Sequence, residues 1–116
     1  MRAYVPVGWA QLATLDAAGH LEGPLRGCAV DAAWRAGSPE VDEEQWEYEA
    51  QLTAAESLAD PDGGVVLAVD VEEDGGGVED GWLDLPGPVS RRDIAAVLTA
   101  DLAWFGVQEI PGLLSR

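Results

Sequence analysis

The chain contains no lysine and no asparagine, and it has one cysteine and one histidine. A single cysteine, Cys28, excludes an intramolecular disulfide and favours a reducing compartment such as the cytoplasm. Without lysine, the phosphate-binding loop of many nucleotide-binding proteins cannot be formed. No apolar run approaches the roughly 20 residues of a membrane span, and the N-terminus lacks the apolar core of a secretion signal. The sequence therefore predicts a cytoplasmic protein that has no membrane partner.

Basic residues are missing between Arg35 and Arg91, a stretch in which sixteen Asp and Glu residues fall. The rest of the chain is neutral, so this stretch accounts for the whole net charge of −16. A surface of one sign repels polyanions and attracts cationic surfaces. Phosphate contacts need Lys or Arg, so we expect no direct nucleic-acid binding and favour a basic protein as partner.

Two compositional explanations of the charge stand beside this functional one. Plentiful Ala, Gly, Arg, Val and Asp, without Lys or Asn, is the residue usage of a GC-rich genome. A salt-adapted protein would also be acidic, but over its whole surface, whereas both ends of this chain are neutral. The sequence leaves open whether the acidic stretch was selected.

The apolar content predicts one folded domain spanning residues 1–116. Of the 116 residues, 47% are hydrophobic and five are tryptophan. This composition excludes a disordered acidic tail, which would be poor in aromatic residues. The length is close to the commonest domain size.

Turn residues and hydrophobic spacing predict the elements of the N-terminal half. Residues 2–6 read as a strand that ends at Pro6, because proline lacks the N–H of the ladder. A helix follows from Gly8 to about Gly19, with Trp9 and Leu12 on one face. Residues 25–30 fit either a strand or an extended loop, and Asp31 is a suitable N-cap for a short helix to about residue 36.

A longer helix is predicted from about Pro39 to Ala59. Ser38 is a plausible N-cap, and proline suits the first helical position. Apolar residues recur at helical spacing along this segment. We expect this stripe to face the core: Val41, Tyr48, Leu52, Ala55 and Ala59.

The C-terminal half contains one apolar run and several ambiguous segments. Residues 65–71 predict a central strand buried on both faces, and residues 78–85 predict its antiparallel return strand. Residues 91–99 fit a helix or a strand, and residues 101–110 predict a closing helix. Together the elements predict an α+β (or α/β) fold, with three to four helices packed on a small mixed sheet of three to four strands.

The acidic helix holds the residues that we consider most relevant to function. Glu43 and Glu47 lie four residues apart and repel each other, which a basic partner would relieve. Trp46 lies off the apolar stripe, so it fits either an exposed anchor for an Arg-rich partner or a second face packed on another element. The acidic loop after the central strand extends the surface. The candidate partner-binding residues are Glu43, Glu44, Trp46, Glu47, Glu72, Glu73 and Asp74.

No metal, cofactor or catalytic residue is predicted. A divalent cation needs several converging oxygen ligands, which the helix and loop carboxylates supply only if the two segments are neighbours. The turn that begins at Asp60 resembles the start of a calcium loop, but its twelfth position is Val71 and not glutamate. His20 follows a helix end, and Cys28 fits a small buried hydrophobe. The serines lack the flanking glycines of a hydrolase nucleophile.

Several short stretches carry a further signal through their order along the chain. They are Met1–Pro6, Gly23–Arg26 with Ala29-Val30, Asp42–Glu44 with Glu47-Tyr48, Ile94–Val97, and Trp104–Pro111. In this order they resemble a small, uncharacterised protein family of actinobacteria. The family provides no catalytic residues that could be assigned to this chain. The resemblance implies a strand-like segment at residues 94–98. The relatives carry additional sequence after the equivalent of residues 99–101, which implies that an element of their fold is shortened or missing here.

Two functional hypotheses follow from these observations. The first is a non-enzymatic acidic module that binds a basic protein in the cytoplasm. The second is a small-molecule-binding protein or an enzyme, with a carboxylate-lined pocket between sheet and helices. A concave apolar pocket with converging polar groups would favour the second.

Overall fold

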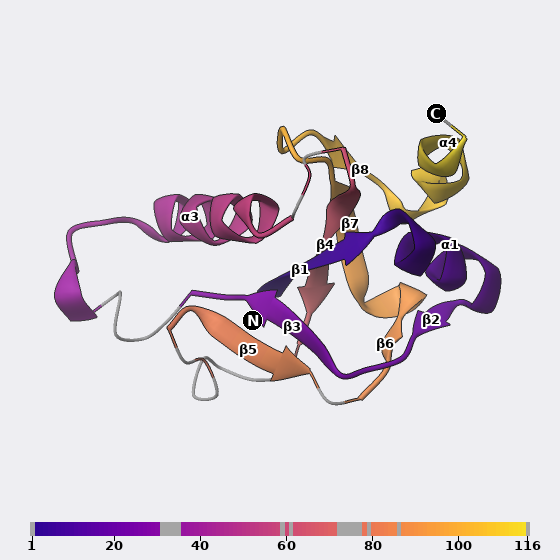
Figure 1. Ribbon diagram of the computed structural model, residues 1–116. Helices are drawn as coiled ribbons and strands as arrows, with labels where there is room; N and C mark the ends of the chain where they lie inside the picture. The colour runs from indigo at the N-terminus through magenta and orange to yellow at the C-terminus, as the bar shows by residue number, and fades with distance from the viewer. Residues whose placement is uncertain are drawn as a thin grey trace.

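The computed structural model describes residues 2–30, 36–58, 60, 62–71, 78, 80–85 and 87–115. In this part of the chain, a six-stranded antiparallel sheet carries helices on both faces (Figure 1). Helix α3 (Glu43–Glu56) lies on one face, and helices α1 (Trp9–Ala18) and α4 (Ile110–Leu114) lie on the other. The fold is therefore α+β, and the predicted three to four strands were too few.

The sheet is built from strands that lie far apart in the sequence. Its order is β5 (Trp82–Leu85), β3 (Leu25–Cys28), β1 (Arg2–Gly8), β4 (Gly64–Asp70), β7 (Ile94–Leu98) and β8 (Trp104–Phe105). A second, two-stranded sheet pairs β2 (His20–Leu21) with β6 (Val89–Ser90). Two short 3₁₀ helices, η1 (Arg91–Asp93) and η2 (Val107–Glu109), connect the later elements.

The pairing of β1 with β4 forms the centre of the sheet. It runs from Arg2 opposite Asp70 to Gly8 opposite Gly64. Successive side chains of a strand point to opposite faces, so Leu67 packs under α1 and α4 while Ala68 packs under α3. Every β4 residue except the last is buried, which confirms the prediction of a doubly buried central strand.

The predicted hairpin between the central strand and residues 78–85 is wrong. Strand β5 pairs with β3, whereas the two edges of β4 are occupied by β1 and β7. The two ambiguous segments are both strands, since residues 25–28 form β3 and residues 94–98 form β7. Strand β1 also continues two residues beyond Pro6.

The predicted closing helix at residues 101–110 is wrong as well. The chain turns back after β7, where the Thr99 N–H donates to the Ala103 carbonyl at 3.0 Å, and then forms β8 and η2. Helix α4 begins at Ile110, and Pro111 lies in its first turn. This position is favourable because proline suits the start of a helix rather than its end. Trp104, in β8, is 50% exposed.

Helix α3 is shorter than predicted and presents a different face to the sheet. Its N-cap is Asp42, whose carboxylate accepts a hydrogen bond from the Gln45 N–H at 2.9 Å. The predicted apolar stripe is confirmed at Ala55, which is buried, and is wrong at Tyr48, which is 51% exposed. The face that packs on the sheet carries small side chains together with Gln51. The buried residues are Ala50, Gln51, Ala54 and Ala55. The short helix predicted from Asp31 and the end predicted at Ala59 lie outside the described residues.

Candidate functional sites

The outward side of α3 forms an exposed acidic surface, which we call the acidic face. It consists of Glu44, Tyr48, Glu49 and Glu56, all of which are exposed. Residues four apart are neighbours on a helix surface, so Tyr48 lies one turn from Glu44, and the next residue, Glu49, is exposed as well. The acidic face therefore combines an accessible aromatic ring with carboxylates.

The ion pairs seen among the described residues do not involve the acidic face. Arginine forms three of them, Arg2–Asp70, Arg26–Asp84 and Arg91–Asp16, and His20 contacts Glu22. Among the described residues, no ion pair includes Glu44, Glu49 or Glu56. The negative charge of this surface is thus not neutralised by these parts of the chain.

The structure separates the predicted partner-binding residues into three groups. Glu43 and Glu44 are exposed. Trp46 is half-buried and packs against the core beneath α3, which agrees with its alternative interpretation. Glu47 is turned toward the sheet. Glu72, Glu73 and Asp74 lie outside the described residues.

Glu47 takes part in a polar contact between α3 and β1. The Tyr4 hydroxyl donates to Glu47 Oε2 at 2.8 Å and accepts from Gln51 Nε2 at 3.3 Å. Tyr4 is 1% exposed, and its burial raises the pKa of the phenol to about 12. In this structure Glu47 holds the helix on the sheet, a role that sequence periodicity did not reveal.

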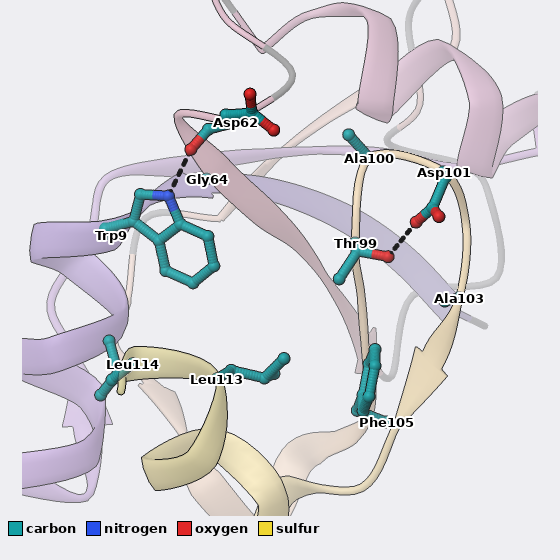
Figure 2. A pocket seen from close by; sticks show the side chains of 10 residues that line it. All are labelled: Trp9, Asp62, Gly64, Thr99, Ala100, Asp101, Ala103, Phe105, Leu113 and Leu114. Atoms are coloured by element: carbon teal, nitrogen blue, oxygen red, sulfur yellow. Dashed lines mark hydrogen bonds between the residues drawn. The ribbon is translucent and has the colours of Figure 1, made fainter. Parts of the chain in front are cut away.

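A second candidate site lies on the opposite face of the sheet. A cleft of about 980 Å³ opens between α1, α4 and the turn from β7 to β8 (Figure 2). Segments that lie far apart in the sequence contribute to its walls. The lining residues are Trp9, Asp62, Gly64, Thr99, Ala100, Asp101, Ala103, Phe105, Leu113 and Leu114.

Six of the ten described residues that line the cleft are aromatic or aliphatic. The Trp9 indole Nε1–H donates to the Asp62 carbonyl oxygen at 2.6 Å, which fixes the orientation of the ring. Figure 2 shows Trp9 and Phe105 on opposite sides of the space, with Leu113 projecting from α4 below Trp9. Apolar side chains therefore border the space on several sides.

One carboxylate of the cleft is held by its neighbouring turn. The Thr99 hydroxyl donates to Asp101 Oδ1, and the Leu102 N–H donates to the Thr99 carbonyl at 2.8 Å. Asp101 was predicted to begin a helix and Asp62 to belong to a turn, so neither was a candidate site residue. No local motif could have identified them, because the cleft forms only when segments far apart in the sequence meet.

The remaining reactive side chains have structural surroundings. His20 pairs with Glu22 at 3.0 Å on the surface. Cys28 is fully buried, and this burial raises the pKa of its thiol to about 11, so the thiol stays protonated at neutral pH. Within the described ranges, no three His, Cys, Asp or Glu residues gather as a metal site would require. No helix in the same ranges is long and apolar enough to cross a membrane.

Comparison with known proteins gives a family but no activity. Residues 1–101 match the model of a family of unknown function, DUF6912. No curated protein and no solved structure matches the chain. The matched part contains α3 and the Trp9, Asp62, Thr99 and Asp101 side of the cleft, whereas β8 and α4 follow it.

Proposed function

We propose that this chain, which belongs to the family of unknown function DUF6912, is a non-enzymatic module that binds a basic protein segment in the cytoplasm. The acidic face of α3 is the proposed binding surface. The observation that carries the proposal is the 51% exposure of Tyr48, one helical turn from Glu44, on a helix surface that also carries the exposed Glu49. Neither carboxylate has an ion pair among the described residues.

The chemistry of this surface fits an arginine-containing partner. A guanidinium group stacks on an aromatic ring and forms paired hydrogen bonds with a carboxylate. Tyrosine and arginine are also enriched among the residues that dominate interface energies. The anchor that we propose is Tyr48, in place of the half-buried Trp46. Nucleic acid is not a proposed partner, because the surface repels phosphate.

Neutralising the acidic face should weaken the binding of a basic peptide. We expect a short arginine-rich peptide to shift the backbone amide resonances of α3 around Tyr48 in an NMR titration. Each exposed ion pair contributes roughly 0.2 to 1 kcal/mol, so Glu44→Gln with Glu49→Gln should lower the affinity roughly two- to thirtyfold. The dependence of the affinity on salt should also flatten.

A charge-matched variant separates the local surface from the overall charge. Glu22→Gln with Glu109→Gln removes the same two charges from exposed positions outside α3. Glu109 accepts a hydrogen bond from the Gly106 N–H at 2.7 Å, and the amide oxygen that Glu109→Gln introduces can accept it as well. This control should bind as the wild type does. Equal weakening of both double variants, or shifts spread over the whole chain, would refute the acidic face as a binding surface.

A further inference from the structure

The cleft beside α1 and α4 has a chemistry that the acidic face does not share. We propose that it binds a small organic ammonium ion that carries an apolar body. This site lies on the other side of the sheet from α3, so the proposal is independent of the one for a basic protein segment. It assigns the chain a small-molecule ligand of a defined class.

The opposed rings of Trp9 and Phe105 define the space for the apolar body. The indole N–H of Trp9 is already used by the Asp62 carbonyl, so the ring offers its face and edge to a ligand and no donor. Leu113, which is 3% exposed, closes the bottom of the space from α4. A ligand seated here would bury apolar surface against three hydrophobic side chains.

The charged groups of the cleft specify a cation. Among the described residues that line the cleft, the charged ones are Asp62 and Asp101, and both are acidic. An ammonium group near the turn would meet the Asp101 carboxylate, whose position is set by the Thr99 hydroxyl. The face of an aromatic ring also attracts cations. A nucleotide, a phosphate or a carboxylate ligand would be repelled by the same groups.

The size of the cleft favours an organic cation over a metal ion. A volume of about 980 Å³ is in the range of pockets that hold small organic molecules. A metal ion would need several oxygen or nitrogen ligands in contact with it. The described residues contain no group of three such side chains. The apolar walls would add nothing to the coordination of a bare ion.

Three probes of similar shape and different charge test the proposal. They are 2-phenylethylammonium, 2-phenylethanol and 3-phenylpropionate, each titrated into the isotopically labelled full chain. The side-chain N–H resonance of Trp9, assigned with a Trp9→Phe variant, reports occupancy. We expect the ammonium probe to bind at least tenfold more tightly than the alcohol, and the carboxylate to bind most weakly.

A single substitution tests the role of the carboxylate. Asp101→Asn keeps an oxygen that can accept the Thr99 hydrogen bond, so the turn should persist. It should lower the affinity for the ammonium probe about tenfold and leave that for the alcohol unchanged. Glu22→Gln removes one charge elsewhere and should change neither affinity.

Three outcomes would overturn the proposal. One is binding of the alcohol as tightly as the ammonium probe, which would leave an apolar cleft without charge selection. Another is a Trp9 resonance that no probe moves. The last is equal weakening by Asp101→Asn and Glu22→Gln, which would show attraction to the overall charge only. None of these results bears on peptide binding at the acidic face.

Discussion

Substituting Gly64 by alanine is expected to lower the free energy of unfolding by about 3 kcal/mol or more, as for severe overpacking. A methyl group at this position would overlap the carbonyl oxygen of Val7 and lie 3.1 Å from the Gly8 Cα atom. These are backbone atoms of the paired strand β1, so a side-chain rotation cannot relieve the overlap. Urea unfolding followed by tryptophan fluorescence would measure the loss.

A second glycine supplies the control for this prediction. Gly112 lies within α4, and a methyl group there would meet no atom within 4 Å. Gly112→Ala should leave the stability unchanged or raise it by up to about 1 kcal/mol, since alanine favours a helix. Similar losses for both variants would contradict a close approach specific to Gly64.

The same close approach contributes to the cleft. Gly8 stands opposite Gly64, and the next residue along the chain is Trp9. Strand β4 begins two residues after Asp62, whose carbonyl accepts the indole hydrogen bond. The two glycines thus bring the start of α1 beside the turn that precedes β4. A partly folded Gly64→Ala variant should therefore also lose the Trp9 response to the ammonium probe.

The central strand could be predicted because its signal is local. Residues 65–71 are an uninterrupted apolar and β-branched run between turn residues, which is typical of a strand buried on both faces. The ends of α1 were predicted for a similar reason, since Gly19 adopts the left-handed conformation (φ 80°) that ends the helix. A signal of this kind needs no knowledge of distant segments.

The orientation of α3 could not be predicted from hydrophobic spacing. Large apolar residues such as Tyr48 and Leu52 defined the expected stripe, whereas the sheet accepts a face of alanines with Gln51. The polar Gln51 is tolerated there because its amide donates to the Tyr4 hydroxyl. That partner lies 47 residues away in the sequence.

The strand pairing and the cleft could not be predicted from the sequence, and the physical reason is the same for both. Residues 82–85 could have paired with either β3 or β4. They pair with β3 because β7 occupies the second edge of β4. The cleft needs Trp9, Asp62 and the segment from Thr99 to Leu114 to meet. Such long-range contacts follow from packing of the whole chain and leave no motif.

Alkaline pH is expected to destabilise the fold by on the order of 2 to 3 kcal/mol for each of two buried groups. Burial raises the pKa of Cys28 from 9.0 to about 11, and that of Tyr4 from 10.0 to about 12. The unfolded chain therefore loses these protons at lower pH than the folded chain does. The stabilisation is complete below pH 9 for Cys28 and below pH 10 for Tyr4. It is lost as the pH rises to about 11 and about 12 respectively.

Substitutions assign the two parts of this alkaline loss, measured as urea unfolding free energies from pH 8 to 12 in the presence of a reductant. Cys28→Ala should remove the part that begins near pH 9, and Tyr4→Phe the part that begins near pH 10. Tyr4→Phe should also be about 1 to 3 kcal/mol less stable at pH 8, because the buried Gln51 amide loses its acceptor. Its stability curve should thus approach that of the wild type at high pH. Tyr48→Phe, which removes the hydroxyl of an exposed tyrosine, should follow the wild-type curve throughout. Parallel curves for the wild type, Cys28→Ala and Tyr4→Phe would show that neither buried group causes the alkaline loss.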